Sequence, residues 1–259
     1  MAAEANPGVG GGLLTGGVSA DSRTPVVGQT NLHVGSTWNG PLADHSMSIV
    51  FRKLSVGRGR LHRMTGSDLK ADLHRYLQVA REALLWKLDG LSEYDIRRPM
   101  TSTGTNLLGL VKHVAVVELG YFGGTFGRPS DEPLPWFDND AEPNADMWAT
   151  AEEPRDQIVG LYHRAWAHSD ATIEALSLDA VGRVPWWPED RREVTLHRTL
   201  VHVIAETDRH VGHADIIREL IDGAAGLREG NDNMAPGDQA WWETYRNRLE
   251  RVAQEAGQH

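Results

Sequence analysis

The 259-residue sequence contains no cysteine. This absence excludes disulfide bonds, thiolate ligands for a metal ion and a cysteine nucleophile. Any metal ion that the protein holds must therefore be bound by histidine, aspartate or glutamate side chains.

The sequence also lacks long apolar runs and an excess of positive charge. No uninterrupted stretch of about 18 apolar residues is present, although a membrane-spanning helix needs that length. The first residues show no charged segment followed by an apolar one, which is the pattern of a secretion signal. Lys and Arg number 26 against 36 Asp and Glu, so there is no broad basic footprint for nucleic acid. We expect a cytoplasmic protein that binds neither membranes nor nucleic acid.

The composition changes near residue 64. Residues 1–63 hold 11 of the 27 glycines and show no sustained period of a helix or a strand. We therefore expect a disordered, glycine-rich extension over residues 1–63 and one folded domain over residues 64–259.

Within that domain, apolar residues recur at helical spacing in four long segments. Thr105 and Thr195 are the expected N-caps of the second and fourth segments, and Gly223 is the expected stop of the fourth. The four predicted helices cover about residues 68–88, 106–124, 154–176 and 195–222.

Two further segments complete the prediction. The proline-rich residues 127–148 form a connection that is longer than a tight turn requires. Residues 236–257 carry Trp241, Tyr245 and Leu249 on one side and predict a fifth helix that packs on the others. No β pattern of comparable length is present. The sequence thus predicts an all-α four-helix bundle with a long connection between its second and third helices and an extra C-terminal helix.

The fourth predicted helix carries ionisable side chains on a face that should be apolar. In "HVIAETDRHVGH", which begins at His202, the helical turn of about 100° per residue places His202, Glu206, His210 and His213 on one face. A metal ion could be held by one of three pairs: His202 and Glu206, Glu206 and His210, or His210 and His213. A lone histidine such as His202 is more often a hydrogen-bonded core residue. Four such groups together are costly unless they are paired or bind a metal, so the pattern predicts a metal site.

Such a site needs a further ligand from another helix. His113 is the best candidate because it is the one histidine of the second predicted helix and lies near its middle. His74, His163 and His168 belong to the first and third predicted helices and are weaker candidates.

The segments "LLGLVKHVAVVELGYFGG" and "TLHRTLVHVIAETDRHVGHADIIRELIDG" resemble the DinB-like superfamily, and within it an actinobacterial branch close to mycothiol transferases. The resemblance covers about residues 64–223 and implies a four-helix bundle. Most such proteins use a histidine of the second helix and an H-x-x-x-H pair of the last bundle helix. Here the first position of that pair is Glu206, as in mycothiol-dependent maleylpyruvate isomerase relatives. The resemblance therefore implies His113, Glu206 and His210 as ligands and zinc as the metal, with Ni²⁺ or Fe²⁺ as alternatives.

The same resemblance implies mycothiol as the cosubstrate and a small electrophile that is either conjugated to it or isomerised. Two imidazoles and one carboxylate leave an open position on a catalytic zinc ion. A thiol bound there would lose its proton below its ordinary pKa of about 8.5. We expect His213 to act as the proton acceptor and Trp136, Trp186 and Trp187 to line the pocket, although paired tryptophans are often packing residues.

Two other functions are compatible with the same residues. One is a non-haem iron enzyme, because two histidines and a carboxylate can form its facial triad. The other is a non-catalytic metal-binding module that acts in the response to stress. The sequence is also compatible with a homodimer.

Overall fold

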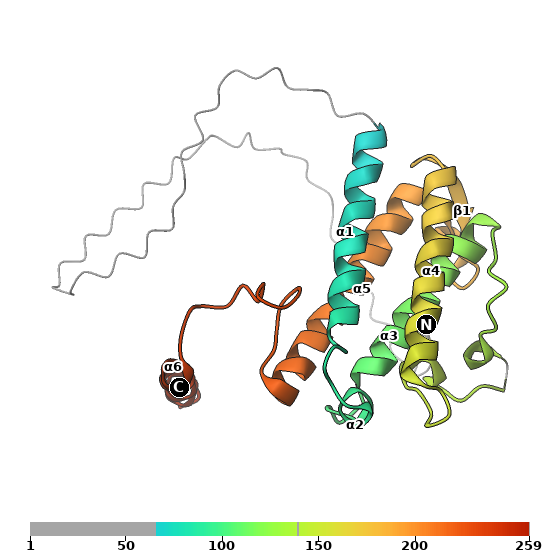
Figure 1. Cartoon of the computed structure of the whole chain (residues 1–259). Coiled ribbons are helices and arrows are strands. Elements are labelled where there is room, and N and C mark those ends of the chain that lie inside the picture. Colours follow the sequence, from blue (N-terminus) through green and yellow to red (C-terminus); the bar gives the residue numbers. More distant parts are fainter. Residues whose placement is uncertain (1–65, 139, 259) are drawn as a thin grey trace, which may run out of the picture. The chain divides into compact units, whose positions relative to one another are not determined.

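The computed structural model describes residues 66–138 and 140–258. Four of its helices lie side by side as a bundle (Figure 1). In this bundle α1 packs on α5, and α3 packs on both α4 and α5. The helices are α1 (Gly66–Trp86), α3 (Leu107–Glu118), α4 (Arg155–Ala175) and α5 (Leu196–Asp222). The predicted all-α bundle is confirmed, whereas the predicted extension over residues 1–63 lies outside the described residues.

Helix α3 forms the centre of the bundle, and all of its residues are buried. Its N-cap is Asn106, whose side chain accepts a hydrogen bond from the backbone of Gly109, so the expected cap at Thr105 was wrong by one residue. The helix continues into a π-helical turn, η1 (Leu119–Gly123), and a 3-10 turn, η2 (Gly124–Phe126). By length and composition Leu107–Phe126 could cross a membrane, but most of this segment is buried inside the bundle, as in the core helix of a globular domain.

A charged network lies among the apolar core residues. Arg81 of α1 and Glu118 of α3 are both completely buried, and two hydrogen bonds of 2.9 and 2.5 Å join them. Arg81 also donates to Asp170 of α4 over 2.8 Å. Burial alone would lower the pKa of Arg81, but the two carboxylates raise it above its ordinary value, so this guanidinium stays charged.

Helix α5 begins and ends where the sequence indicated. The Thr195 side chain accepts a hydrogen bond from the Arg198 backbone, and Gly223 adopts the left-handed conformation with φ of 82° that ends many helices. Lys87 and Arg218 are both buried and join the end of α1 to the last part of α5. These contacts hold the C-terminal ends of α1 and α5 together.

The connections contain elements that the sequence did not predict. A short helix, α2 (Glu93–Arg97), follows α1, and the 3-10 turns η3 (Pro135–Phe137) and η4 (Ala145–Met147) lie in the long connection before α4. Strands β1 (Val181–Arg183) and β2 (Glu193–Thr195) pair antiparallel, with Gly182 opposite Val194. This small hairpin carries Trp186 and Trp187 between its strands, and a further 3-10 turn, η5 (Glu189–Arg191), precedes β2.

The C-terminal helix is present, but it does not pack as expected. Helix α6 (Gln239–Ala256) starts after Asp238, whose side chain accepts a hydrogen bond from the Trp241 backbone. Within the described part of the chain none of its residues is buried, so the prediction that it packs on the other helices was wrong. Its aromatic residues contact each other instead, and the rings of Trp241 and Tyr245 stack 5.2 Å apart.

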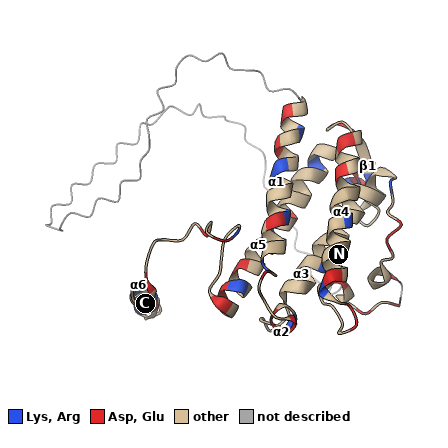
Figure 2. Ribbon diagram, viewed as in Figure 1, with Lys and Arg blue, Asp and Glu red and all other residues tan. Residues whose placement is uncertain are grey.

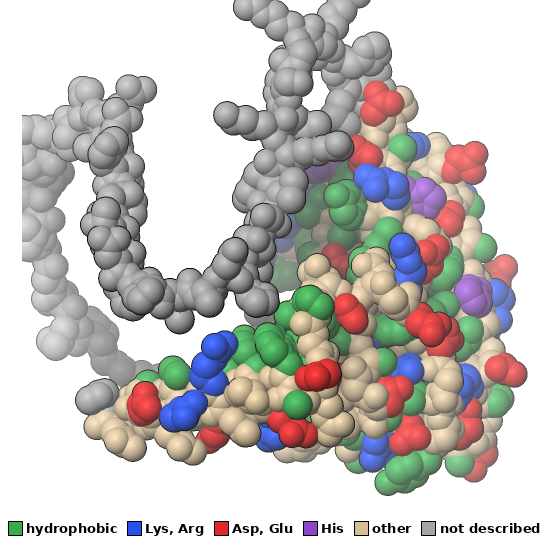
Figure 3. All heavy atoms as spheres, turned by 60° about the vertical axis from the view of Figure 1, so that its left-hand side comes forward, with side chains coloured by type: hydrophobic (Ala, Val, Ile, Leu, Met, Phe, Trp, Pro, Cys, Tyr) green, Lys and Arg blue, Asp and Glu red, His purple; other side chains and the backbone are tan. Residues whose placement is uncertain are grey.

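Acidic and basic residues both occur along the helices (Figure 2). On the face drawn in Figure 3, Lys and Arg are scattered among Asp, Glu and apolar side chains. Acidic and basic groups are thus interspersed on this face.

Candidate metal centre

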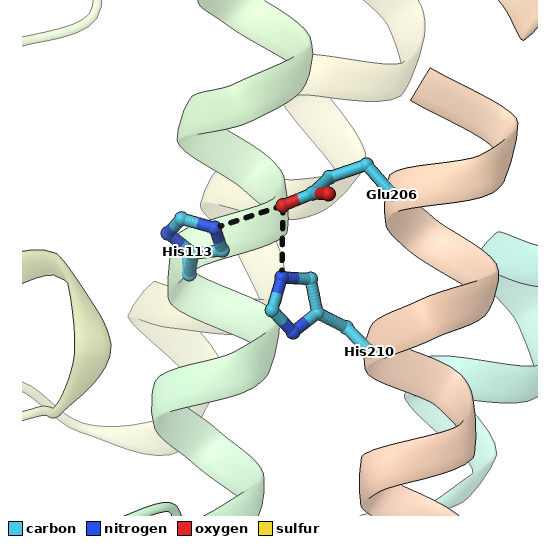
Figure 4. Close-up of side chains that lie close together, drawn as sticks. All are labelled: His113, Glu206 and His210. Carbon is cyan, nitrogen blue, oxygen red and sulfur yellow. Dashed lines mark hydrogen bonds and ion pairs between the residues drawn. The ribbon is translucent and has the colours of Figure 1, made fainter. Parts of the chain in front are cut away.

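Three side chains from two helices meet on one side of the bundle. His113 extends from α3, and Glu206 and His210 extend from successive turns of α5 (Figure 4). Glu206 Oε1 lies 3.1 Å from His210 Nε2 and 3.8 Å from His113 Nε2. Each residue offers one ligand atom, and these atoms lie within 4.8 Å of one another.

The electrostatics of the three residues favour a charged carboxylate. His113 and His210 are buried and Glu206 is half-buried. The nearby imidazole of His113 and the hydrogen-bonded imidazole of His210 lower the pKa of Glu206 far below its ordinary range, although partial burial acts in the opposite direction. Glu206 is therefore ionised at any pH near neutrality.

A second carboxylate contacts the far side of His113. Asp146 lies in η4 and is itself buried, and its Oδ2 lies 2.7 Å from His113 Nδ1. Burial would lower the pKa of His113, but the hydrogen bond to Asp146 and the nearby carboxylate of Glu206 outweigh it and raise this pKa. Burial would likewise raise the pKa of Asp146, but the contact with His113 lowers it. Asp146 was not among the predicted site residues, because it lies in an irregular segment without periodicity.

The three donor atoms are suited to a divalent transition-metal ion such as Zn²⁺. Imidazole nitrogen and carboxylate oxygen are ligands that Zn²⁺, Ni²⁺ and Fe²⁺ accept, and three protein ligands are typical of catalytic zinc sites. His113, with its Nδ1 bonded to Asp146, has the histidine–carboxylate arrangement that is common around protein-bound metals. These three residues could therefore hold such an ion.

The other two histidines of the α5 face do not join this group. His202 lies one turn before Glu206 and contacts aromatic rings, with ring centroids 4.7 Å from Tyr121 and 5.3 Å from Trp187. His213 is exposed, and its ring lies 5.5 Å from that of His210. Of the pairs compatible with the sequence, the structure therefore brings together Glu206 and His210.

The three tryptophans expected around the site occupy two different places. Trp186 and Trp187 both pack against Tyr121 of η1, and the Trp187 indole donates to the Tyr121 hydroxyl over 3.0 Å. A Cβ at Gly120 would lie 3.1 Å from the Trp186 ring, so glycine permits this close packing. Trp136 of η3 instead covers the ammonium group of Lys112, 3.9 Å from its ring centroid.

The weaker histidine candidates have partners of their own. His74 Nε2 lies 2.7 Å from Asp170, and His168 Nε2 lies 2.8 Å from the carbonyl oxygen of Arg128. The ring of His163 contacts Trp166. The structure does not bring any of the three to the group of His113, Glu206 and His210.

We expect the affinity for zinc to fall as the pH decreases from 8 to 6. Protons compete with the metal for the imidazole nitrogens. Because the pKa of His113 is raised, this side chain binds its proton already at a pH above the ordinary pKa of 6.5. Glu206 stays ionised over this range and adds no pH dependence. Competition with a chelator of known pH dependence measures the affinity. His202→Gln should show the same slope, whereas an affinity that does not change between pH 6 and 8 would contradict the assignment of two histidine ligands.

Comparison with known proteins assigns the chain to a family. The family described as Mycothiol-S-transferase matches residues 72–223, which are more than half of the chain and include all three residues of the group. None of the curated proteins compared with the chain matches it.

Proposed function

We propose that this chain, which belongs to the mycothiol-S-transferase family, transfers mycothiol to a small electrophile in the cytoplasm with a divalent metal ion, zinc, held by His113, Glu206 and His210. The observation that carries the proposal is the convergence of these three side chains within the part of the chain that the family matches. The absence of cysteine is consistent with it, because the cosubstrate then supplies the sulfur nucleophile.

The metal ion supplies one effect when it is bound, which is to lower the pKa of a thiol that coordinates it. His113 and His210 contribute neutral nitrogen donors, and Glu206 contributes a single negative charge. A doubly charged ion thus keeps a net positive charge beside these three ligands. The chain itself provides the surroundings in which the thiol meets its acceptor.

His213 is suited to accept the proton of the thiol. Partial desolvation and the neighbouring His210 and Arg209 lower its pKa, so its imidazole is neutral at pH 7. Its exposed position next to His210 allows it to pass the proton on to water. In the transfer, sulfur forms a bond to carbon, the leaving group departs with the bonding electrons, and the thiol proton goes to His213.

The aromatic group of Tyr121, Trp186 and Trp187 offers a surface for the apolar part of the electrophile. It lies next to His202, one turn of α5 before Glu206. Trp186 is 36 % exposed and Trp187 is partly buried, so both rings can be reached from solvent. Trp136 packs on Lys112, the residue next to His113.

The test is the conjugation of mycothiol to a chromogenic aryl halide by the full-length, zinc-loaded protein. We expect a rate that rises in proportion to zinc occupancy and persists below pH 8.5, where the free thiol is mostly protonated at its pKa of about 8.5. His213→Gln should lower the rate by roughly 100-fold while zinc stays bound. The disappearance of thiol and the release of halide measure the reaction.

Controls separate this function from metal binding alone. The exposed His197 lies on α5 outside the group, and His197→Gln should leave the rate unchanged. Equal rates for zinc-loaded and zinc-free protein, with mycothiol and other small thiols alike, would exclude the transferase and favour a non-catalytic metal-binding module.

A further inference from the structure

The short turn that carries Asp146 is held against α3 by a row of residues on one side of that helix. Asn106, Gly109 and Lys112 are spaced three residues apart, so they lie along one face of the helix. His113 directly follows the last of them. The row therefore connects the start of α3 with the candidate ligand at its middle.

Each residue of this row contacts the backbone of residues 145–148. Asn106 donates to the carbonyl oxygen of Met147 over 3.2 Å. The ammonium group of Lys112 donates to the carbonyl oxygens of Ala145 and Trp148, over 3.0 and 2.8 Å. These carbonyl groups lie before and after Asp146, so the turn is held on both sides of this residue.

Gly109 allows the turn to approach α3. A Cβ at this position would lie 1.8 Å from the carbonyl oxygen of Met147, a distance that no side chain can occupy. Asn144 enters the turn with φ of 62°, a left-handed conformation that asparagine tolerates better than most residues. The contact between the turn and α3 thus depends on the absence of a side chain in a helix that is otherwise tightly packed.

We propose that the turn of residues 145–148 is a positioning element, in which Asp146 fixes the tautomer and the orientation of His113. With Asp146 accepting a hydrogen bond from Nδ1–H over 2.7 Å, the other nitrogen, Nε2, keeps its lone pair and faces Glu206 and His210. Asp146 is thus a positioning residue that acts through His113. The inference rests on the proposed function only in assuming that Nε2 binds a metal ion.

The first experiment uses the zinc-free, full-length protein. Long-range ¹H–¹⁵N spectra of the histidine rings report which nitrogen carries the proton. We expect His113 of the wild type to be protonated at Nδ1 above its pKa. Asp146→Asn should keep this tautomer because the amide oxygen still accepts a hydrogen bond, and Asp146→Ala should lose it. An unchanged tautomer in Asp146→Ala would overturn the proposal.

The second experiment measures zinc affinity by competition with a chromophoric chelator. Loss of a partner to a metal-binding histidine typically weakens binding by about 10- to 100-fold, and we expect this loss for Asp146→Ala and a smaller one for Asp146→Asn. Gly109→Ala changes neither Asp146 nor His113 but displaces the turn, so it should weaken binding as well. Gly212→Ala is the matched control, because a Cβ there meets open space in the helix that carries the other two ligands.

The two experiments distinguish this proposal from the proposed function. Zinc affinity that is unchanged in Asp146→Ala, but lost in His113→Ala, would overturn the positioning role while leaving the metal site in place. If Gly109→Ala fails to fold, Lys112→Met tests the same contact from the next turn of α3. A wild-type protein that binds no zinc would refute the metal site, and the tautomer measurement would still decide whether Asp146 orients His113.

Discussion

Glu206→Ala is expected to bind zinc more than about 100-fold more weakly than the wild type, because even the loss of an outer partner of a ligand costs 10- to 100-fold. The Glu206 carboxylate lies close to both histidines and provides the only negative charge of the group. The fold should survive, because the side chain is half-buried at the edge of the core. Zinc content per chain after dialysis and the melting temperature measure the two effects.

The exposed Glu219 lies on the same helix and provides the matched control, since Glu219→Gln should retain zinc. His113→Ala and His210→Ala should lose it as Glu206→Ala does. Equal zinc content in all of these variants would contradict the proposed ligands. Loss of zinc in His213→Ala alone would instead assign the site to His210 and His213.

The second large effect concerns stability. Arg81→Met is expected to lower the free energy of unfolding by about 3–5 kcal/mol, because it leaves the buried charge of Glu118 without its partner. In Arg81→Met/Glu118→Leu the loss should be much smaller than the sum of the two single effects, since both charges of the buried pair are then removed together. Urea unfolding curves measure both.

An exposed ion pair of α1 supplies the control for this prediction. Arg75 lies 3.3 Å from Asp72, and both side chains are about half-exposed or more. Surface pairs of this kind contribute about 0–1 kcal/mol, so Arg75→Met should change stability little. A loss of similar size in Arg75→Met and Arg81→Met would show that the burial of the second pair has no energetic consequence.

The regular parts of the molecule could be predicted because helical periodicity is encoded locally. The face of α5 that carries Glu206 and His210 follows from the turn of the helix alone. His113 could be selected because it is the one histidine of its predicted helix. Its actual distance from Glu206 depends on how α3 and α5 pack, which the residue spacing does not contain.

The irregular parts carry the features that the sequence did not reveal. Asp146 lies 33 residues after His113 in the sequence, in a turn without periodicity. Its contact with His113 depends on Gly109, because a side chain at that position would collide with the turn. The amphipathic pattern of α6 predicted a helix correctly, but such a pattern does not specify what its apolar side contacts. The hairpin around Trp186 and Trp187 consists of strands of three residues each, too short for a pattern to emerge.

The π-helical turn η1 makes the site sensitive to the length of the chain as well as to its composition. A π turn contains one residue more than an α turn, so the residues that follow it are offset by about 100° from the direction that they would have in a continuous α-helix after His113. Deletion of Gly120 would turn Tyr121 by about 100° away from Trp186 and Trp187 without replacing any of the three. This deletion should therefore separate the aromatic surface from the candidate metal ligands, although every side chain of both would still be present.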